Sequence, residues 1–268
     1  NNPYLFFSLV LAVAFVLFGY LFFKYANSKE MTLVTHSGIF HTDDVFAAAA
    51  LAILNERRGD IFKLVRTRDE NLLNKYVENK KKQRRIVFDV GGVYDREDDL
   101  FDHHQEGGAG ERENGIPYSS FGLIWEKYGH EICRSQEVAD IIDKKIGYFI
   151  DAEDNGIRSY ESIYKDIETY TIGDVKTNFI PHENRTMGEY DRQFMKAMDF
   201  AEMVLWNLIR RNHKKLRIKD ELKEEYEKSE DKKIFISEKR YGRSNFIEYP
   251  ECLFLVSPSV EGKTKGEW

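Results

Sequence analysis

The stretch MTLVTHSGIFHTDDVFAAAALAILNE, residues 31–56, decides the fold class of this chain. It opens with an apolar run, residues 31–36, of the kind that forms a buried strand, and it closes with an alanine-rich apolar helix from Asp44 to Glu56. Two histidines and two aspartates lie between them. A buried strand that leads directly into a buried helix begins a strand-helix-strand unit, so the stretch predicts an α/β domain.

The same alternation continues along the chain. The segments IFKLVRT and RIVFDVGG, residues 61–67 and 85–92, are typical of two further strands, and a helix is expected at residues 70–76 between them. Two later helices are expected at residues 121–128 and 135–149. Such alternation predicts a parallel sheet flanked by helices, in which ligands bind beyond the carboxyl ends of the strands.

A smaller domain of mixed helix and strand is expected after residue 156. Helical spacing is strong at residues 188–227, where the charged end indicates a solvated face, and short strands are expected at residues 233–237 and 252–257. The domains expected from sequence are therefore a catalytic α/β domain at residues 31–156 and a helical and α+β substrate-side domain at residues 157–268.

The N-terminal segment has a different composition. Residues 4–23 are twenty residues without a charge, enough for a transmembrane helix, and Lys24 and Lys29 follow them. The positive-inside rule then places the catalytic domain in the cytoplasm, anchored to the inner face of a membrane. Because Met31 opens the first strand, a second reading stays open, in which residues 1–30 are an upstream extension that the natural soluble protein lacks.

Composition excludes some kinds of site. The formal net charge of −6, from 40 basic and 46 acidic residues among 268, gives no global positive field for nucleic acid. The two cysteines, Cys133 and Cys252, lie far apart and outside any CxxC pattern. The sequence therefore supports neither a disulfide framework nor a thiolate zinc site.

Acidic and imidazole side chains gather where the expected strands end. Taken singly, each has an ordinary explanation as a helix cap, a turn residue or a core histidine. Four separate segments that bring them to one sheet edge instead indicate a metal site, since buried carboxylates repel one another unless cations or protons neutralise them. Mixed carboxylate and imidazole ligands suit divalent manganese first, then magnesium or iron, and zinc less exclusively. The candidates are His36, His41, Asp43, Asp44, Asp89, Asp102, His103, His104, Asp151 and Asp154.

Six motifs carry a resemblance to a known family. They are THSGIFHTDDVFAAAAL, VRTRD, VFDVGGVYD, FDHHQ, YSSFGLIW and IDAEDNG, in this order. The chain resembles the melanocyte proliferating gene family, a branch of the DHH phosphoesterase superfamily, over most of residues 31–268. The resemblance implies a DHH-type α/β domain with two divalent metal ions, usually manganese, and a 3′-to-5′ exonuclease activity on RNA or short oligonucleotides.

The resemblance also implies roles for individual residues. His36 and His41 would hold the first metal and Asp43, His103 and Asp151 the second, with Asp89 between the two and Asp154 as an additional candidate ligand. Asp102 would orient an imidazole, and His104 would lie near the scissile phosphate as an acid or electrostatic stabiliser. Arg66 and Arg68 are candidates for phosphate contact, with ordinary surface charges as the alternative. His41 departs from the superfamily, where many members have a carboxylate, which leaves the metal open.

Several functional alternatives stay open at this stage. The two-metal chemistry would activate water for phosphodiester hydrolysis, but the same machinery serves pyrophosphatases and cyclic-dinucleotide phosphodiesterases. A membrane-tethered, non-catalytic metal-binding protein is the alternative from another class. The resembling family continues into a further glycine-rich segment, so the C-terminal domain is expected to be incomplete. The oligomeric state is left open.

Overall fold

The structure is a computed structural model that describes residue 15 and residues 28–78 and 84–258. The chain divides between Trp206 and Asn207 into two compact units. The first holds the sheet, the helices around it and every candidate site residue. The domain limits expected from the sequence stay a prediction.

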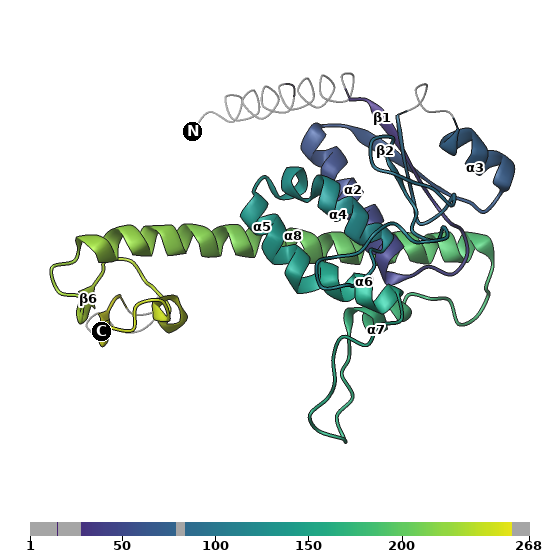
Figure 1. The fold of residues 1–268 in the computed structure, drawn as a ribbon. Helices are drawn as coiled ribbons and strands as arrows, with labels where there is room; N and C mark the ends of the chain where they lie inside the picture. Colours follow the sequence, from purple (N-terminus) through teal and green to yellow (C-terminus); the bar gives the residue numbers. More distant parts are fainter. Residues whose placement is uncertain (1–14, 16–27, 79–83, 259–268) are drawn as a thin grey trace, which may run out of the picture. The chain divides into compact units, whose positions relative to one another are not determined.

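The first unit is built on a five-stranded, mostly parallel sheet with the strand order β2-β1-β3-β5-β4. Figure 1 labels the neighbouring strands β1 and β2 of this sheet. The four strands β2, β1, β3 and β5 run parallel, which confirms the α/β class. The edge strand β4 pairs antiparallel with β5, because only a tight turn connects the two short strands. The strands are β1 Glu30–Thr35, β2 Ile61–Arg66, β3 Arg85–Phe88, β4 Tyr94–Asp95 and β5 Leu100–Phe101.

Helices cover both faces of this sheet. On one face, Leu73 of α3, Glu70–Val77, packs with Val34, Val87 and Leu100. Side chains alternate along a strand, so the neighbouring residues of β1, β3 and β5 lie on the opposite face. There α2, Thr42–Arg58, contacts β1 and β2 and also α4, Ser120–Cys133. Every residue of α2 from Thr42 to Asn55 is buried, which accounts for its continuous run of small and apolar residues.

The helix expected at residues 135–149 is part of a longer run. It begins as α5, Gln136–Ile142, passes through a π-helical segment, Asp143–Gly147, and continues as α6, Tyr148–Asp154. A short helix, α7, Ile172–Thr177, follows α6 in the chain. Helices α6 and α7 both contribute residues to the candidate site described below.

The long helix α8, Met187–Lys228, extends into both units, close to the expected limits of residues 188–227. In the first unit its apolar face is buried at Phe194, Met198, Ala201 and Leu205, residues spaced by three or four. In the second unit the end of α8 packs with a two-stranded parallel sheet of β6, Ile234–Ile236, and β7, Phe254–Val256, and a 3₁₀ turn, Arg243–Phe246. Its core contains Leu222, Tyr226, Phe235 and Tyr241.

Within the described part of the chain, no helix combines the length and apolar character needed to cross a membrane. The transmembrane helix expected at residues 4–23 lies outside the described residues, apart from Phe15.

Candidate metal centre

The candidate ligands come from the ends of three parallel strands and of two helices. His36 follows β1, Asp89 follows β3, and the pair Asp102 and His103 follows β5. His41 and Asp43 lie at the start of α2, and Asp154 is the last residue of α6. This edge is where parallel sheets place their ligands, so the topology itself brings these segments together.

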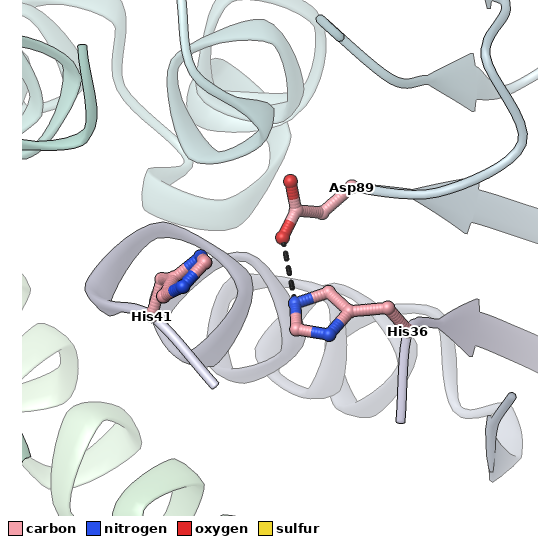
Figure 2. A group of neighbouring side chains, drawn as sticks. All are labelled: His36, His41 and Asp89. Carbon is pink, nitrogen blue, oxygen red and sulfur yellow. Dashed lines mark ion pairs between the residues drawn. The ribbon is translucent and has the colours of Figure 1, made fainter. Parts of the chain in front are cut away.

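Asp89 lies at the centre of the cluster. Its backbone is in the left-handed region, with φ of 55°, where a residue other than glycine is strained. One carboxylate oxygen, Oδ2, lies 3.0 Å from Nε2 of His36, and the other, Oδ1, lies 3.2 Å from Nε2 of His103. Figure 2 shows the rings of His36 and His41 beside this carboxylate, with ring centres 5.6 Å apart. Asp89 therefore faces two sets of ligands.

The two sets contain different residues. On the first side, nitrogen and oxygen atoms of His36, His41 and Asp89 lie within 4.8 Å of one another. On the second side, Nε2 of His103 lies 3.3 Å from Oδ2 of Asp154 and 3.8 Å from Oδ2 of Asp43. Each set offers both imidazole and carboxylate, the ligand mixture expected for a transition metal ion.

The cluster is buried and short of positive partners. His36 is 2% exposed, and Asp43 and Asp44 are fully buried. Nε2 of His36 lies 3.0 Å from Oδ2 of Asp44 and 3.0 Å from Oδ2 of Asp89, so one imidazole nitrogen faces two carboxylates. Oδ1 of Asp43 has no hydrogen-bond partner among the described residues. Buried polar atoms are rarely left unpaired, and carboxylate oxygens and an imidazole nitrogen are donors for a divalent cation. The residues present therefore fit metal ions.

The pKa values of the cluster follow from the same crowding of acids. Burial, with the negative charge of Asp89, Asp154 and Asp44, raises the pKa of Asp43 well above its usual value. Burial also raises the pKa of Asp44. Burial opposes protonation of His36, but the nearby carboxylates of Asp44 and Asp89 raise the pKa of His36 to about 10. The shifts of Asp43, Asp44 and His36 all favour their protonated forms. Burial opposes ionisation of Asp89, but the two histidines that contact its carboxylate hold the pKa of Asp89 below its usual value. A metal ion would have to displace protons from Asp43, Asp44 and His36.

Asp102 holds the DHH segment in place and orients His104. Its carboxylate accepts hydrogen bonds from the backbone N–H groups of Gly92 at 2.6 Å and His103 at 2.8 Å. The same carboxylate lies 2.8 Å from Nδ1 of His104, whose side chain is 58% exposed. This contact raises the pKa of His104, which favours the imidazolium form. His104 thus faces solvent beside the cluster.

The start of α4 supplies a support that the sequence analysis did not identify. The hydroxyl of Ser120 donates a hydrogen bond of 2.7 Å to Oδ2 of Asp43. The hydroxyl of the neighbouring Ser119 donates to Oδ1 of Asp151 at 2.5 Å. The motif YSSFGLIW contains this serine pair at the start of an expected helix, where serine hydroxyls commonly act as caps. The pair could therefore have been identified from the sequence.

Asp151 is held away from the candidate ligands. It is fully buried, and its Oδ2 accepts a hydrogen bond of 2.6 Å from Nε of Arg112, whose guanidinium also binds Asp143. None of the potential metal-binding groups among the described residues includes Asp151, whereas one includes Asp154. Asp151 and Asp154 are both on α6, three residues apart, and Asp154 is the one whose carboxylate lies in the cluster. Arg112 was not identified from the sequence.

The two arginines expected at the substrate are engaged in other contacts. The side chain of Arg66 is 3% exposed and binds Asp191 at 2.7 Å and the carbonyl oxygen of Gly38 at 2.9 Å. Arg68 donates to the carbonyl oxygen of Ser37 and lies 3.0 Å from Nδ1 of His36. These contacts hold the turn between β1 and α2, which carries His36 and His41, in its conformation.

A cavity of about 280 Å³ lies next to the cluster. His41 and Asp154 form part of its wall, and the rest comes from the start of α2, the end of α6 and from α7. A space for a ligand is thus available beside the candidate metal ligands.

Comparison with known proteins gives a family match over most of the chain. The model of the family described as "Uncharacterised protein family (UPF0160)", with the short name MYG1_exonuc, matches residues 32–253. A human protein named MYG1 exonuclease is 32% identical over 201 residues, which cover 67% of this chain and 51% of the human protein. A Dictyostelium discoideum protein named MYG1 protein is 29% identical over 188 residues, covering 64% of this chain and 54% of that protein.

The chain spans about half the length of the curated relatives it matches. No solved structure gives a significant match.

Proposed function

Since the chain belongs to the MYG1 family, UPF0160, as its motifs predicted, we propose that the cluster around Asp89 is the two-metal centre of a phosphodiesterase. Its substrate would be RNA or a short oligonucleotide, from which nucleotides are removed at the 3′ end. Relatives that carry the name MYG1 exonuclease support the nuclease assignment. The observation that carries the proposal is the position of Asp89, whose two oxygens lie against two histidines from different strand ends.

We assign the ligands in two sets that share Asp89. His36, His41 and Asp89 would hold the first ion, and Asp43, Asp89, His103 and Asp154 the second. Asp154 replaces Asp151 in this assignment, because Asp151 is engaged by Arg112. Imidazole and carboxylate donors without thiolate make manganese the first choice. Two divalent cations would supply the charge that lowers the pKa of water and stabilises the attacking and leaving oxygens of an in-line displacement.

The chain's own residues would perform the proton transfer. A water oxygen forms a bond to phosphorus while the bond from phosphorus to the 3′ oxygen of the preceding nucleotide breaks. The products are a nucleoside 5′-monophosphate and a chain that is one nucleotide shorter and ends in a 3′ hydroxyl. His104, whose pKa is raised by its contact with Asp102, would give its proton to the leaving 3′ oxygen.

The test is hydrolysis of a 5′-labelled short RNA with added Mn²⁺, with pyrophosphate and a cyclic dinucleotide as comparison substrates. The wild type should shorten the RNA in single-nucleotide steps and release 5′-monophosphates. Asp89→Asn should lower the rate by roughly a hundredfold or more, because both ions lose a ligand. Activity on pyrophosphate alone would replace the nuclease assignment by a pyrophosphatase, and inactivity on all three substrates would contradict the proposal.

A further inference from the structure

The cavity beside the cluster has walls of two kinds. One wall is formed by His41 and Asp154, which the proposed function assigns to the metal ions. Another part of the wall is formed by α7, which contributes Asp174 and Lys176. A molecule that bound at the metal ions and filled the cavity would therefore contact α7.

Gly173 allows α7 to approach the end of α6. This residue is buried, and a Cβ atom added there would lie 1.7 Å from Oε1 of Glu153, too close for any side chain. A glycine is thus required for the packing of these two helices, because the Glu153 carboxylate occupies the space of the missing side chain. The close packing places Lys176, three residues further along α7, on the wall of the cavity.

Lys176 supplies positive charge next to the candidate ligands. Its side chain is only partly exposed, and Nζ lies 3.5 Å from the carbonyl oxygen of Phe40, the residue before His41. The predicted phosphate contacts, Arg66 and Arg68, are engaged by Asp191 and by the backbone of the β1–α2 turn. The carboxylates of Glu153 and Asp174 are near enough to interact with the charge of Lys176. Among the described residues, Nζ donates a hydrogen bond to the Phe40 carbonyl alone, and an ammonium group has three hydrogens to donate.

We propose that Lys176 binds the phosphate of the terminal nucleotide of the substrate, and that the cavity holds the remainder of that nucleotide. The inference rests on the phosphodiester hydrolysis proposed above, and it adds a residue and a substrate unit to it. The cavity volume of about 280 Å³ is just below the usual range for ligand pockets, roughly 300–1,000 Å³. It suits one nucleotide and not an oligonucleotide.

The charged residues around the cavity favour one form of the terminal nucleotide of the substrate. Three carboxylates, those of Glu153, Asp154 and Asp174, border the cavity together with Lys176. A nucleotide with an additional 3′ phosphate would bring two more negative charges toward these carboxylates, whereas ribose hydroxyls can donate to them. The cavity therefore fits a nucleotide that has a phosphate at the 5′ position and a free hydroxyl at the 3′ position.

The test is the binding of adenosine 5′-monophosphate and adenosine 3′,5′-bisphosphate, measured by titration calorimetry with Mn²⁺ present. The variants are Lys176→Met, which removes the charge at similar length, and Lys176→Arg, which keeps it. Lys165→Met, at an exposed lysine in the same unit, is the matched control. Melting temperature and Mn²⁺ affinity of each variant show whether the fold and the metal ligands are intact.

The monophosphate should bind to wild type and to Lys165→Met equally, about tenfold or more weakly to Lys176→Met, and nearly normally to Lys176→Arg. The bisphosphate should bind wild type more weakly than the monophosphate does. Equal binding to Lys176→Met and wild type, absence of monophosphate binding, or tighter binding of the bisphosphate would each overturn the inference. Lysine-dependent monophosphate binding by a protein that does not cleave RNA would contradict only the proposed function.

Discussion

At the scale of single residues, Asp89 explains why the two ligand sets form one centre. The residue follows β3 directly with a φ of 55°, and its carboxylate contacts His36, which follows β1, and His103, which follows β5. Such a conformation costs about 1–2 kcal/mol for a residue other than glycine. This conformational strain is explained if it allows the carboxylate to present one oxygen to His36 and the other to His103.

Substitutions of the two adjacent histidines of the DHH motif, residues 102–104, should have different effects on metal binding and turnover. His103 is largely buried and contacts Asp89 and Asp154, so His103→Ala should lower Mn²⁺ affinity by about tenfold or more. His104 is mostly exposed and bound to Asp102, so His104→Ala should retain Mn²⁺ and lose turnover by about a hundredfold. Calorimetry and RNA hydrolysis measure the two effects. Equal loss of metal in both variants would show that His104 is a ligand.

The residue types of the centre could be predicted from the sequence, but not which of two close carboxylates reaches it. The motifs indicated His36, His41, Asp43, Asp89 and His103, and the structure brings these side chains together. The pair on α6 was ambiguous because both aspartates are on one helix. The partner that distinguishes Asp151 is Arg112, which is 39 residues away in sequence. Local patterns do not contain that contact.

At the scale of secondary structure, the start of α4 and the middle of α6 form the frame behind the ligands. Gly122 of α4 lies so close to α6 that an added Cβ atom would be 2.3 Å from Oδ2 of Asp151. Arg112 connects Asp151 to Asp143, and the rings of Tyr118 and Tyr148 lie 4.9 and 4.1 Å from its guanidinium carbon. The frame thus consists of an ion-paired arginine between two aspartates, with two tyrosine rings against the guanidinium group.

Removal of Arg112 should destabilise this frame. Arg112→Met leaves the fully buried Asp151 without its positive partner, which should lower the free energy of unfolding by about 3 kcal/mol in urea denaturation. The matched control is Arg96→Met, at an exposed ion pair with Glu126, where a loss of no more than about 1 kcal/mol is expected. Adding Asp151→Asn to Arg112→Met should recover part of the loss. A loss below about 1 kcal/mol for Arg112→Met would contradict this account.

The order of the main helices and strands could be predicted from the sequence. The elements that could not be predicted are short. Periodicity identified β1, α2, β2, β3 and α8, since these are long or continuously apolar. The two-residue strand β4 and the six-residue helix α7 have too few residues to show a period. Their positions are set by tertiary contacts, such as the packing of Gly173 against Glu153.

At the scale of the whole molecule, the candidate centre lies within the first unit. The family match extends beyond that unit, to residue 253, so the second unit belongs to the family pattern as well. The residues of its small aromatic core all belong to the second unit. The metal chemistry is therefore expected to depend on the stability of the first unit.

Metal binding should stabilise the protein against heat. Asp43, Asp44 and Asp89 are buried close together, and a bound cation would replace their mutual repulsion by attraction. At a concentration of Mn²⁺ 100 times the dissociation constant, linkage adds about 2.7 kcal/mol, which should raise the melting temperature by roughly 5–10 °C. Differential scanning fluorimetry with Mn²⁺ and with a chelator measures the shift. Asp89→Asn should respond far less, and an equal response would place the ions elsewhere.

The most direct test of the two-metal centre is anomalous diffraction from crystals of the protein grown with Mn²⁺. We expect two peaks about 3.5–4 Å apart, both within bonding distance of Asp89. One should lie beside His36 and His41 and the other beside His103 and Asp154. A single peak, or two peaks without a shared Asp89 carboxylate, would contradict the account.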